Sequence, residues 1–329
     1  MIGLFKQKSP ANIVLLFIFG LLLKLPLFLY PKAVVATEND GRLFQFLVSF
    51  VTAGEGKPML NAIIAFLLLY IQALLINYLI NEYRMTTRQT FLPGMAYLMI
   101  TSFLPEWNLL SAALVANTLI IWAFIKLFRL YNIAAASSSI YNIGLLIGLS
   151  TFLFFPSVFF GVCLLLGLMI LRPFRLNELF LFLLGVVTPY YFYYVYLYLT
   201  NNFSTHKLLP KIAIQIQEVH GNIWLIASTF LLIIPFLIGG YYIQTHLRKM
   251  LIQARKNWSI LLLYLLVALF IPFINNTHTF HNWILIAAPF ASFHTTAYLY
   301  PPRKWWPLFL FSITLGAILG QQYFTSSWQ

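Results

Sequence analysis

Residues 60–80 read LNAIIAFLLLYIQALLINYLI, a run of 21 residues that contains no charged side chain. An α-helix of about 20 apolar residues is long enough to cross the hydrocarbon core of a bilayer, which is about 30 Å thick. The run lacks the alternation of polar and apolar residues that strands of membrane β-barrels show. It therefore predicts a transmembrane helix and an all-α membrane protein.

The composition of the whole chain agrees with this interpretation. Of the 329 residues, 61% are hydrophobic, 18% are aromatic and 8% are charged, and the mean hydropathy is +0.85. Soluble domains carry about 25% charged residues. We therefore expect a polytopic protein whose further spans resemble the one at 60–80.

Apolar segments of similar character recur along the chain, separated by short polar turns. They predict eleven transmembrane helices, near residues 11–30, 59–82, 90–104, 109–127, 142–155, 157–171, 178–200, 222–243, 258–274, 282–300 and 306–321. The first is read as a retained helix and not as a cleaved signal, because its apolar run is long and no small-residue cleavage pattern follows.

The basic residues orient these helices, because Lys and Arg gather in cytoplasmic loops. With the N-terminus in the cytoplasm, fourteen basic residues fall inside and five outside, while Lys24 lies within the first span. The inside set is Lys6, Lys8, Arg84, Arg88, Lys126, Arg129, Arg172, Arg175, Arg248, Lys249, Arg255, Lys256, Arg303 and Lys304. The net charge of +13 therefore reflects membrane topology, and we expect no nucleic-acid partner.

This topology depends on residues 142–171, where Phe154-Phe155-Pro156-Ser157 has to turn the chain between two short spans. A single long helix here would invert everything downstream. The inverted version would place the four basic residues of 248–256 outside, against the charge rule. We therefore expect a turn.

Common enzyme motifs are absent from the sequence. It has no P-loop, no GxGxxG after a strand, no HExxH and no GxSxG, and its single cysteine, Cys163, excludes a disulfide framework. Hydrolysis of ATP by this chain alone is therefore not expected. The glycines Gly144, Gly148, Gly239 and Gly240 are interpreted as close contacts between helices.

The candidate chemistry lies in the outer loops, beginning with the loop at about 31–58. It contains Glu38, Asp40 and Arg42, followed by an apolar stretch at 43–52 that is too short to cross a membrane. We expect this stretch to be an interfacial helix with Phe44, Phe46 and Phe50 at the lipid boundary. Such a helix would hold the acidic residues near the headgroup plane.

The second outer loop contains Glu106 between Pro105 and Trp107. One interpretation is a carboxylate that interacts with the positive end of a helix dipole. The other is a carboxylate that faces Asp40, where two such groups suit general-base or metal-binding work.

The two later outer loops carry basic and polar groups. The loop at 201–221 contains His206, Lys207 and Lys211, and the loop at 275–282 contains His278 and His281. Each is either a solvated surface or a site for phosphate. His294, within the tenth span, is read chiefly as an interior histidine with a satisfied hydrogen bond.

Several of these features together resemble the opening of the GT-C superfamily of glycosyltransferases. They are a first span ending in Leu-Lys-Leu-Pro (23–26), an outer loop with Glu38-Asn39-Asp40, a span ending in Asn-Glu-Tyr-Arg (81–84) and a span closing at Leu104-Pro105-Glu106. The resemblance covers about residues 10–200. The chain as a whole also resembles a group of uncharacterised inner-membrane proteins of Bacteroidota, which share the Lys-Ser-Pro opening (8–10).

The GT-C resemblance implies a seven-helix module at 1–200, followed by a C-terminal module of about four helices at 201–329. It implies a polyprenyl-phosphate-linked sugar as donor and Asp40, with Glu38 and Glu106, as the catalytic carboxylates. Phosphate contacts would come from Arg42, His206, Lys207, Lys211, His278 and His281. A divalent metal ion between Asp40 and Glu106 is left open, and the implied location is the bacterial inner membrane.

Two other functions remain open from the residues alone. The chain is alternatively a structural or assembly subunit that binds envelope proteins through its aromatic surface, as the run Tyr190–Tyr194 suggests. A lipid or small-molecule transporter is the third alternative, although no internal repeat supports it. In every case membrane lipids surround the chain.

Overall fold

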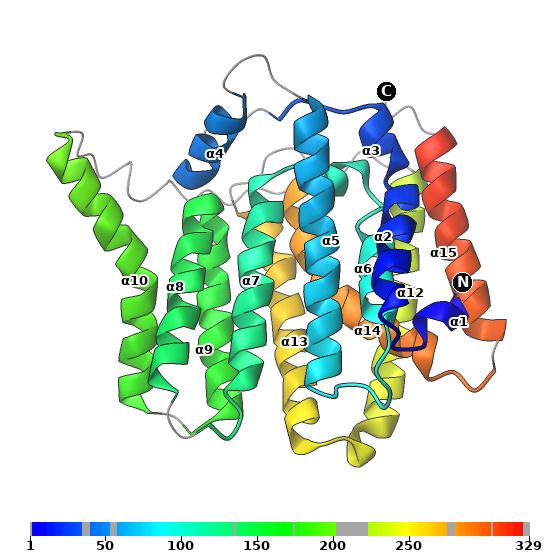
Figure 1. The fold of residues 1–329 in the computed structure, drawn as a ribbon. Coiled ribbons are helices and arrows are strands. Elements are labelled where there is room, and N and C mark those ends of the chain that lie inside the picture. Colours follow the sequence, from blue (N-terminus) through cyan, green and yellow to red (C-terminus); the bar gives the residue numbers. More distant parts are fainter. Residues whose placement is uncertain are drawn as a thin grey trace.

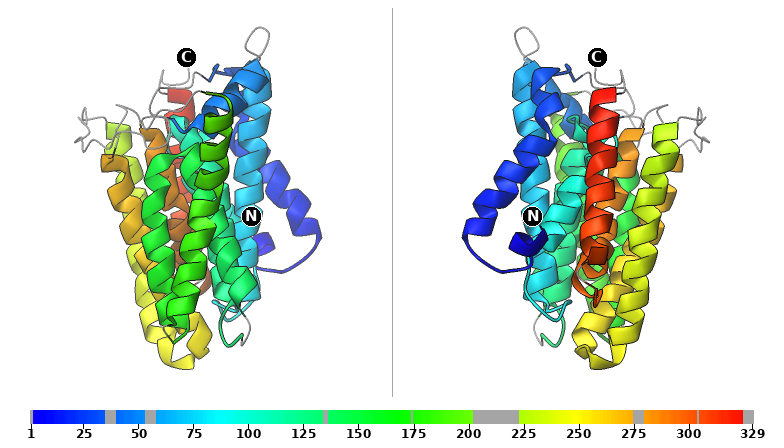
Figure 2. Two further views of the ribbon diagram at one scale, coloured as in Figure 1. Left: turned by 90° about the vertical axis from the view of Figure 1, so that its left-hand side faces the viewer. Right: turned by 90° about the vertical axis from the view of Figure 1, so that its right-hand side faces the viewer.

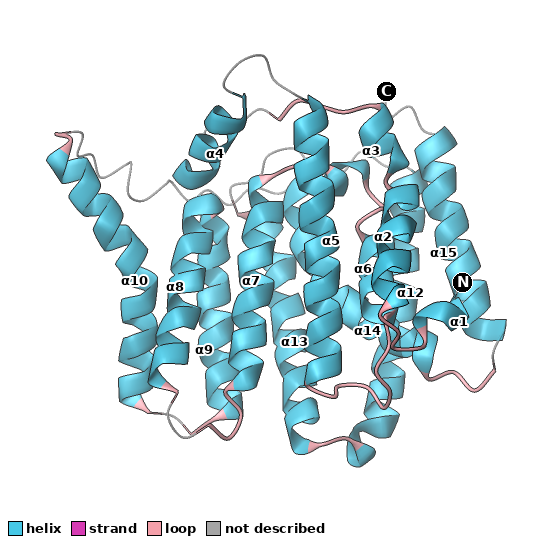
Figure 3. Cartoon of the chain, in the orientation of Figure 1, coloured by secondary structure: helices cyan, strands magenta, loops and turns pink. Residues whose placement is uncertain are grey.

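A computed structural model of the protein describes residues 2–34, 40–52, 58–133, 136–173, 175–201, 223–274, 280–303 and 305–324. Within these ranges the chain forms helices and no strands (Figure 3). The long helices run side by side as a bundle, and α4 lies across one end of it (Figures 1 and 2). The predicted all-α class is confirmed.

The described helices follow one another along the chain. In order they are α1 Ile2–Phe5, α2 Ala11–Leu23, α3 Leu25–Leu29, α4 Arg42–Thr52, α5 Pro58–Glu82, α6 Leu92–Ile100, η1 Pro105–Asn108, α7 Ala112–Arg129, α8 Ser137–Leu153, η2 Phe155–Val158, α9 Phe159–Leu171, α10 Leu176–Leu199, α12 Ile223–His246, η3 Leu247–Lys249, α13 Ile252–Phe270, η4 Ile271–Phe273, η5 Phe280–Ile286, α14 Ala287–Leu299 and α15 Trp305–Phe324. The η elements are short 3₁₀ helices.

Among the described residues, five helical stretches are long and apolar enough to cross a membrane. They are α5, α7, α10, the stretch Trp224–Lys249 and the stretch Ile252–Phe273. Shorter apolar helices, Ala11–Leu23, Ser137–Leu153 and Phe155–Leu171, lie beside them. The architecture is that of a helical membrane protein, while the number of eleven spans stays a prediction.

The expected turn between the fifth and sixth segments is present. Phe154 has extended backbone angles, φ −146° and ψ 103°, and η2 carries the chain from α8 into α9. Ser150 and Ser157 hydroxyls lie 2.9 Å apart across the turn. Pro156 therefore separates two helices that lie side by side in Figure 1.

Two of the expected spans are shorter than the sequence suggests. The segment at 90–104 contains only the nine-residue helix α6, and the segment at 282–300 is divided into η5 and the 13-residue helix α14. Every residue of α6 is buried, and α6 packs directly on α14. Both helices therefore belong to the interior of the bundle, where their apolar side chains face protein.

Three of the four predicted glycine contacts are found. A Cβ atom on Gly144 or Gly148 would come within 3.0 Å of backbone atoms of α10, and one on Gly239 would do the same against α14. Gly240 faces open space instead. The absence of a side chain therefore allows α8 to approach α10 and α12 to approach α14.

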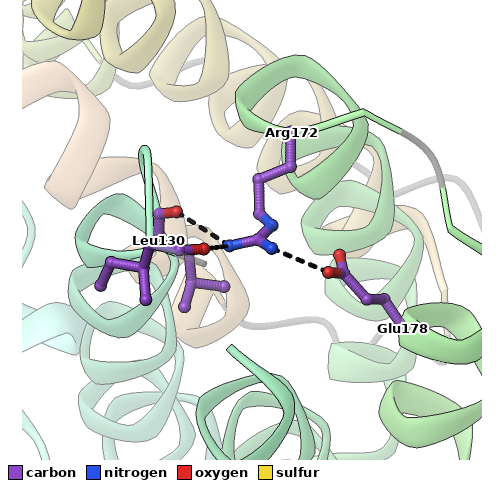
Figure 4. Close-up of polar contacts among 4 residues, drawn as sticks. Leu130, Arg172 and Glu178 are labelled. Carbon is purple, nitrogen blue, oxygen red and sulfur yellow. Dashed lines mark hydrogen bonds and ion pairs between the residues drawn. The ribbon is translucent and has the colours of Figure 1, made fainter. Parts of the chain in front are cut away.

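A buried ion pair joins three helices at the end of the bundle opposite α4 (Figure 4). Arg172, at the end of α9, places Nη2 2.9 Å from Oε1 of Glu178, in the first turn of α10. Its Nη1 atom donates to the carbonyl groups of Leu130 and Ile133, just beyond α7. The ends of α7 and α9 are thereby tied to the start of α10.

One large hydrophobic core runs through both of the predicted modules. It contains Leu16 and Leu69 from the N-terminal part and Leu261, Phe290 and Ile318 from the C-terminal part. Helix α13 packs on α9, and α14 packs on α6. The two halves of the chain therefore bury their apolar surfaces against one another.

Candidate functional site

The start of α4 fixes Asp40 and Arg42 at one end of the bundle. The backbone N–H of Gly41 donates to the carbonyl of Leu153 at 3.0 Å, which docks this loop on the end of α8. A side chain at Gly41 would collide with the backbone of Phe152 and Leu153. Only glycine therefore fits at the position between Asp40 and Arg42.

The polar groups of this turn contact Gln45 on the first turns of α4. Its Nε2 atom donates to the backbone carbonyl of Asp40 at 3.0 Å, and its Oε1 atom accepts from Nη1 of Arg42 at 3.2 Å. Asp40 is half-buried and Arg42 is exposed. Gln45 thus links Asp40 and Arg42 at the N-terminal end of α4.

Helix α4 is amphipathic, as an interfacial helix requires, but one of its aromatic residues was misassigned. Phe46 and Phe50 are 65% and 76% exposed, in agreement with a position at the lipid boundary. Phe44 is buried in the hydrophobic core together with Val48. The reason is the helical period, because residues 44 and 48 share the face that packs on the bundle.

Glu106 and His281, which are 175 residues apart, are brought together by η1 and η5. The Glu106 carboxylate accepts the backbone N–H of Phe280, and Nδ1 of His281 lies 2.9 Å from the Glu106 carbonyl oxygen. Trp107 Nε1 donates to the Phe280 carbonyl at 2.9 Å. These bonds join η1 to the start of η5.

The contact with the Glu106 carbonyl also sets the proton position on His281. A carbonyl oxygen only accepts, so Nδ1 of His281 carries the hydrogen. In the neutral ring Nε2 is then an acceptor.

The half-buried Glu106 carboxylate lies at the start of η1 and not in the first turn of α7. The N-terminus of α7 is capped instead by Ser111, whose hydroxyl oxygen accepts the N–H of Leu114 at 3.2 Å.

An apolar cavity of about 270 Å³ lies between these short helices and α12, α13 and α14. Eleven of its thirteen lining residues are apolar or aromatic, and the other two carry hydroxyl groups. The lining consists of Phe103, Leu104, Trp107, Leu225, Ser228, Thr229, Leu232, Ile233, Leu269, Phe280, Trp283, Ile286 and Phe290. The segments that hold Glu106 and His281 thus also form one wall of the cavity.

Lys24, at the junction of α2 and α3, is fully buried behind the same segment. Its ammonium nitrogen donates to Thr101 Oγ1 at 3.0 Å, to Ser102 Oγ at 3.2 Å and to Asn108 Oδ1. The sequence singled out Lys24 as an unusual charge within a span. Its partners were not predicted, because they lie more than 75 residues away.

A second buried polar group, which the sequence analysis missed, lies at the centre of the bundle. Asn117 donates to Gln72 Oε1 at 3.1 Å and accepts from the Tyr264 hydroxyl at 3.0 Å. Tyr97 donates to the same Gln72 oxygen, and Gln72 donates to Thr118 Oγ1 at 2.7 Å. The sequence signal that could have revealed this group is the presence of the amide side chains of Gln72 and Asn117 within apolar spans.

His294 has the interior role that was expected. It is buried, and its Nε2 atom lies 2.8 Å from the carbonyl of Leu232 on α12. Residue 232 lies in α12 three residues before Pro235. The histidine therefore joins α14 to α12 through a backbone carbonyl.

The remaining candidate residues cannot be placed, because they lie outside the described residues. They are Glu38, His206, Lys207, Lys211 and His278. Across the described part of the chain, no group of three or more His, Cys, Asp or Glu side chains is arranged to hold a metal ion. The site that can be described therefore consists of two groups, Asp40 with Arg42 at the start of α4, and Glu106 with His281 on η1 and η5.

Comparisons with known proteins complete the description of the site. No protein-family model, no curated protein and no solved structure matches the chain. Its likeness to the GT-C superfamily stays a prediction from the residues.

Proposed function

We propose that this protein is a glycosyltransferase of the inner membrane that takes a sugar from a polyprenyl-phosphate-linked donor. One observation carries the proposal: η1 and η5 hold Glu106 and His281 and at the same time form a wall of an apolar cavity. A lipid-linked sugar needs both features side by side, since its tail is apolar and its reacting end is polar.

The lining of the cavity suits a hydrocarbon chain. Ligand pockets enclose about 300–1,000 Å³, and this cavity of about 270 Å³ has room for part of a lipid tail. Trp107, Trp283 and Phe290 offer aromatic surface but few hydrogen-bonding groups. A sugar ring would lose its hydrogen bonds to water there, whereas an isoprenoid segment would lose none.

The proposed reaction is an attack by an acceptor hydroxyl on the anomeric carbon of the donor. A new bond forms between the acceptor oxygen and this carbon, and the bond from the carbon to the phosphate oxygen breaks. The phosphate leaves with the electron pair, and Asp40 accepts the hydroxyl proton as general base. Arg42 is proposed to stabilise the phosphate, and so is His281 in the form that is protonated at both ring nitrogens, because only then does Nε2 donate.

The proposed orientation places α4, η1 and η5 at the outer face of the membrane. The N-terminus and the Arg172–Glu178 pair then lie toward the cytoplasm, and eleven spans connect the two sides. The exposed faces of Phe46 and Phe50 support a position of α4 in the outer headgroup region. The donor phosphate would meet Asp40 and Arg42 at that depth.

Purified protein in liposomes, supplied with a panel of polyprenyl-phosphate sugars and candidate acceptors, tests the proposal. We expect Asp40→Asn to lower transfer by at least about 100-fold, the lower range for loss of a general base. Glu82→Gln is the matched control, because Glu82 is an exposed carboxylate at the far end of α5. Full transfer by Asp40→Asn would disprove the assigned base.

A specific observation also favours a second function, that of an assembly subunit. Helix α10 packs mainly on α8 and exposes aromatic side chains, among them Tyr191, Phe192, Tyr196 and Tyr198 at 61–67%. Lipid or a partner helix would cover this face. A stoichiometric membrane partner that protects these tyrosines from chemical labelling, in a complex indifferent to Asp40→Asn, would support this function over the first.

A further inference from the structure

The surroundings of Lys24 are matched to a charged ammonium group. Thr101 and Ser102 already donate their hydroxyl protons to backbone carbonyls of α6, and the Asn108 atom that faces Lys24 is an oxygen. All three neighbours are therefore acceptors, and an ammonium has three N–H donors to offer. A neutral amine would have two donors and would leave one acceptor unpaired.

This charge is solvated by neutral oxygen atoms. Arg172, the other buried cation described above, is paired with the carboxylate of Glu178, whereas the three hydrogen bonds of Lys24 go to two hydroxyls and an amide. Burial of a cation away from water is costly even after the protein relaxes around it. Ionisable groups at membrane depth are accordingly associated with function.

The three acceptors enclose the segment that carries Glu106. Thr101 and Ser102 precede it and Asn108 follows it, while the residues between them, Phe103, Leu104 and Trp107, line the apolar cavity. Lys24 therefore holds both ends of this cavity wall by hydrogen bonds. The backbone just before Lys24 is held by α15, where Gln322 donates to the Leu23 carbonyl at 2.8 Å.

The hydrogen bonds of Lys24 also bear on η5, because η1 is bonded to η5. Glu106 and Trp107 are each bonded to Phe280, so a displacement of residues 101–108 also displaces the start of η5. We propose that Lys24 is a positioning residue, whose buried ammonium holds η1 and η5 in the arrangement that binds a lipid tail and presents Glu106 and His281. The lipid-binding part of this proposal rests on the proposed function.

Hydrogen exchange of the whole protein in nanodiscs tests the mechanical part without any substrate. In Lys24→Met we expect the amides of residues 101–108 and 280–286 to exchange roughly tenfold faster or more, because three charge-assisted hydrogen bonds are lost. Lys24→Arg, which keeps a charged multiple donor, should recover much of the protection.

Arg172→Met is the matched control, since it removes a buried cation at the opposite end of the bundle. It should speed exchange at 130–133 and 172–178 and leave 101–108 unchanged. Equal exchange of 101–108 in Lys24→Met and wild type would overturn the proposal, as would the same increase in Arg172→Met. If Lys24→Met does not fold, Thr101→Val removes one acceptor and should loosen the same two segments.

Binding of a C15 isoprenyl phosphate tests the ligand part. We expect Lys24→Met to weaken its affinity at least about tenfold relative to Arg172→Met, at a temperature where both variants are folded. Equal affinity in the two variants would show that Lys24 supports the fold alone. If wild-type protein fails to bind the probe, the proposed function fails, while the exchange experiment still decides whether Lys24 positions η1 and η5.

Discussion

The backbone N–H of Gly41 donates to the carbonyl of Leu153, which joins the turn before α4 to the end of α8. This single contact is possible only because residue 41 has no side chain. It holds Asp40 and Arg42 on the bundle at the start of α4. The position of a candidate catalytic base thus depends on a close approach of two backbones.

Gly41→Ala should release α4 from α8. The added methyl group would overlap the carbonyl of Phe152, so the loop has to move away and the hydrogen bond to Leu153 is lost. We expect faster hydrogen exchange and faster proteolysis in α4, with little change in α5–α7. Gly316→Ala is the control, because Gly316 has open space around it, and an equal response in both variants would contradict the prediction.

The adjacent glycines of α12 should respond in opposite ways. Gly239→Ala would force a methyl group against the Phe293 carbonyl and the Thr296 hydroxyl of α14, and we expect a lower melting temperature. Gly240→Ala meets nothing within 4 Å and should be neutral or stabilise by up to about 1 kcal/mol through helix propensity. Thermal unfolding in one detergent compares the two, and similar melting temperatures would refute the assigned packing.

The Arg172–Glu178 pair should show strong coupling. Arg172→Met or Glu178→Gln alone leaves a partner buried without its counter-charge or main hydrogen bond, since the side chains are only 7% and 9% exposed. A loss of about 3–5 kcal/mol is typical when one member of such a pair is removed. The double variant should lose less than the sum of the single losses, as measured by a double-mutant cycle of unfolding. Additive losses would show that the pair is not coupled.

Filling the cavity should abolish binding of the isoprenyl phosphate. Ser228 is buried and lines the cavity, so the ring of Ser228→Phe would occupy the space proposed for a lipid tail. Ile226→Phe adds a ring on an exposed position of the same helix and should bind the probe as wild type does. Binding is measured by equilibrium titration in nanodiscs, and undiminished affinity in Ser228→Phe would exclude this cavity as the tail site.

Local sequence patterns predicted the features that depend on neighbouring residues. Pro156 and the aromatic residues before it indicated the turn between α8 and α9, and the spacing of Gly144 and Gly148 indicated a close helix contact. These predictions succeed because their causes lie within the segment itself, where Pro156 comes two residues after the extended backbone of Phe154 and the two glycines permit close packing.

The features that the sequence did not predict depend on contacts between distant segments. Apolar composition alone does not distinguish α6, which is buried throughout, from a helix that faces lipid. The pairing of Glu106 with Phe280 joins residues 174 positions apart. Such contacts arise from the packing of the whole bundle, and no local period encodes them.

The polar group around Gln72 and Asn117 has a consequence for biosynthesis. Tyr264 of α13 supplies the proton that Asn117 Oδ1 accepts, and α13 is synthesised long after α5, α6 and α7 have left the ribosome. Until α13 arrives, that amide oxygen lacks this partner at membrane depth, where an unpaired polar group is costly. The polar group of the first half of the chain therefore becomes complete only once α13 has packed against α7.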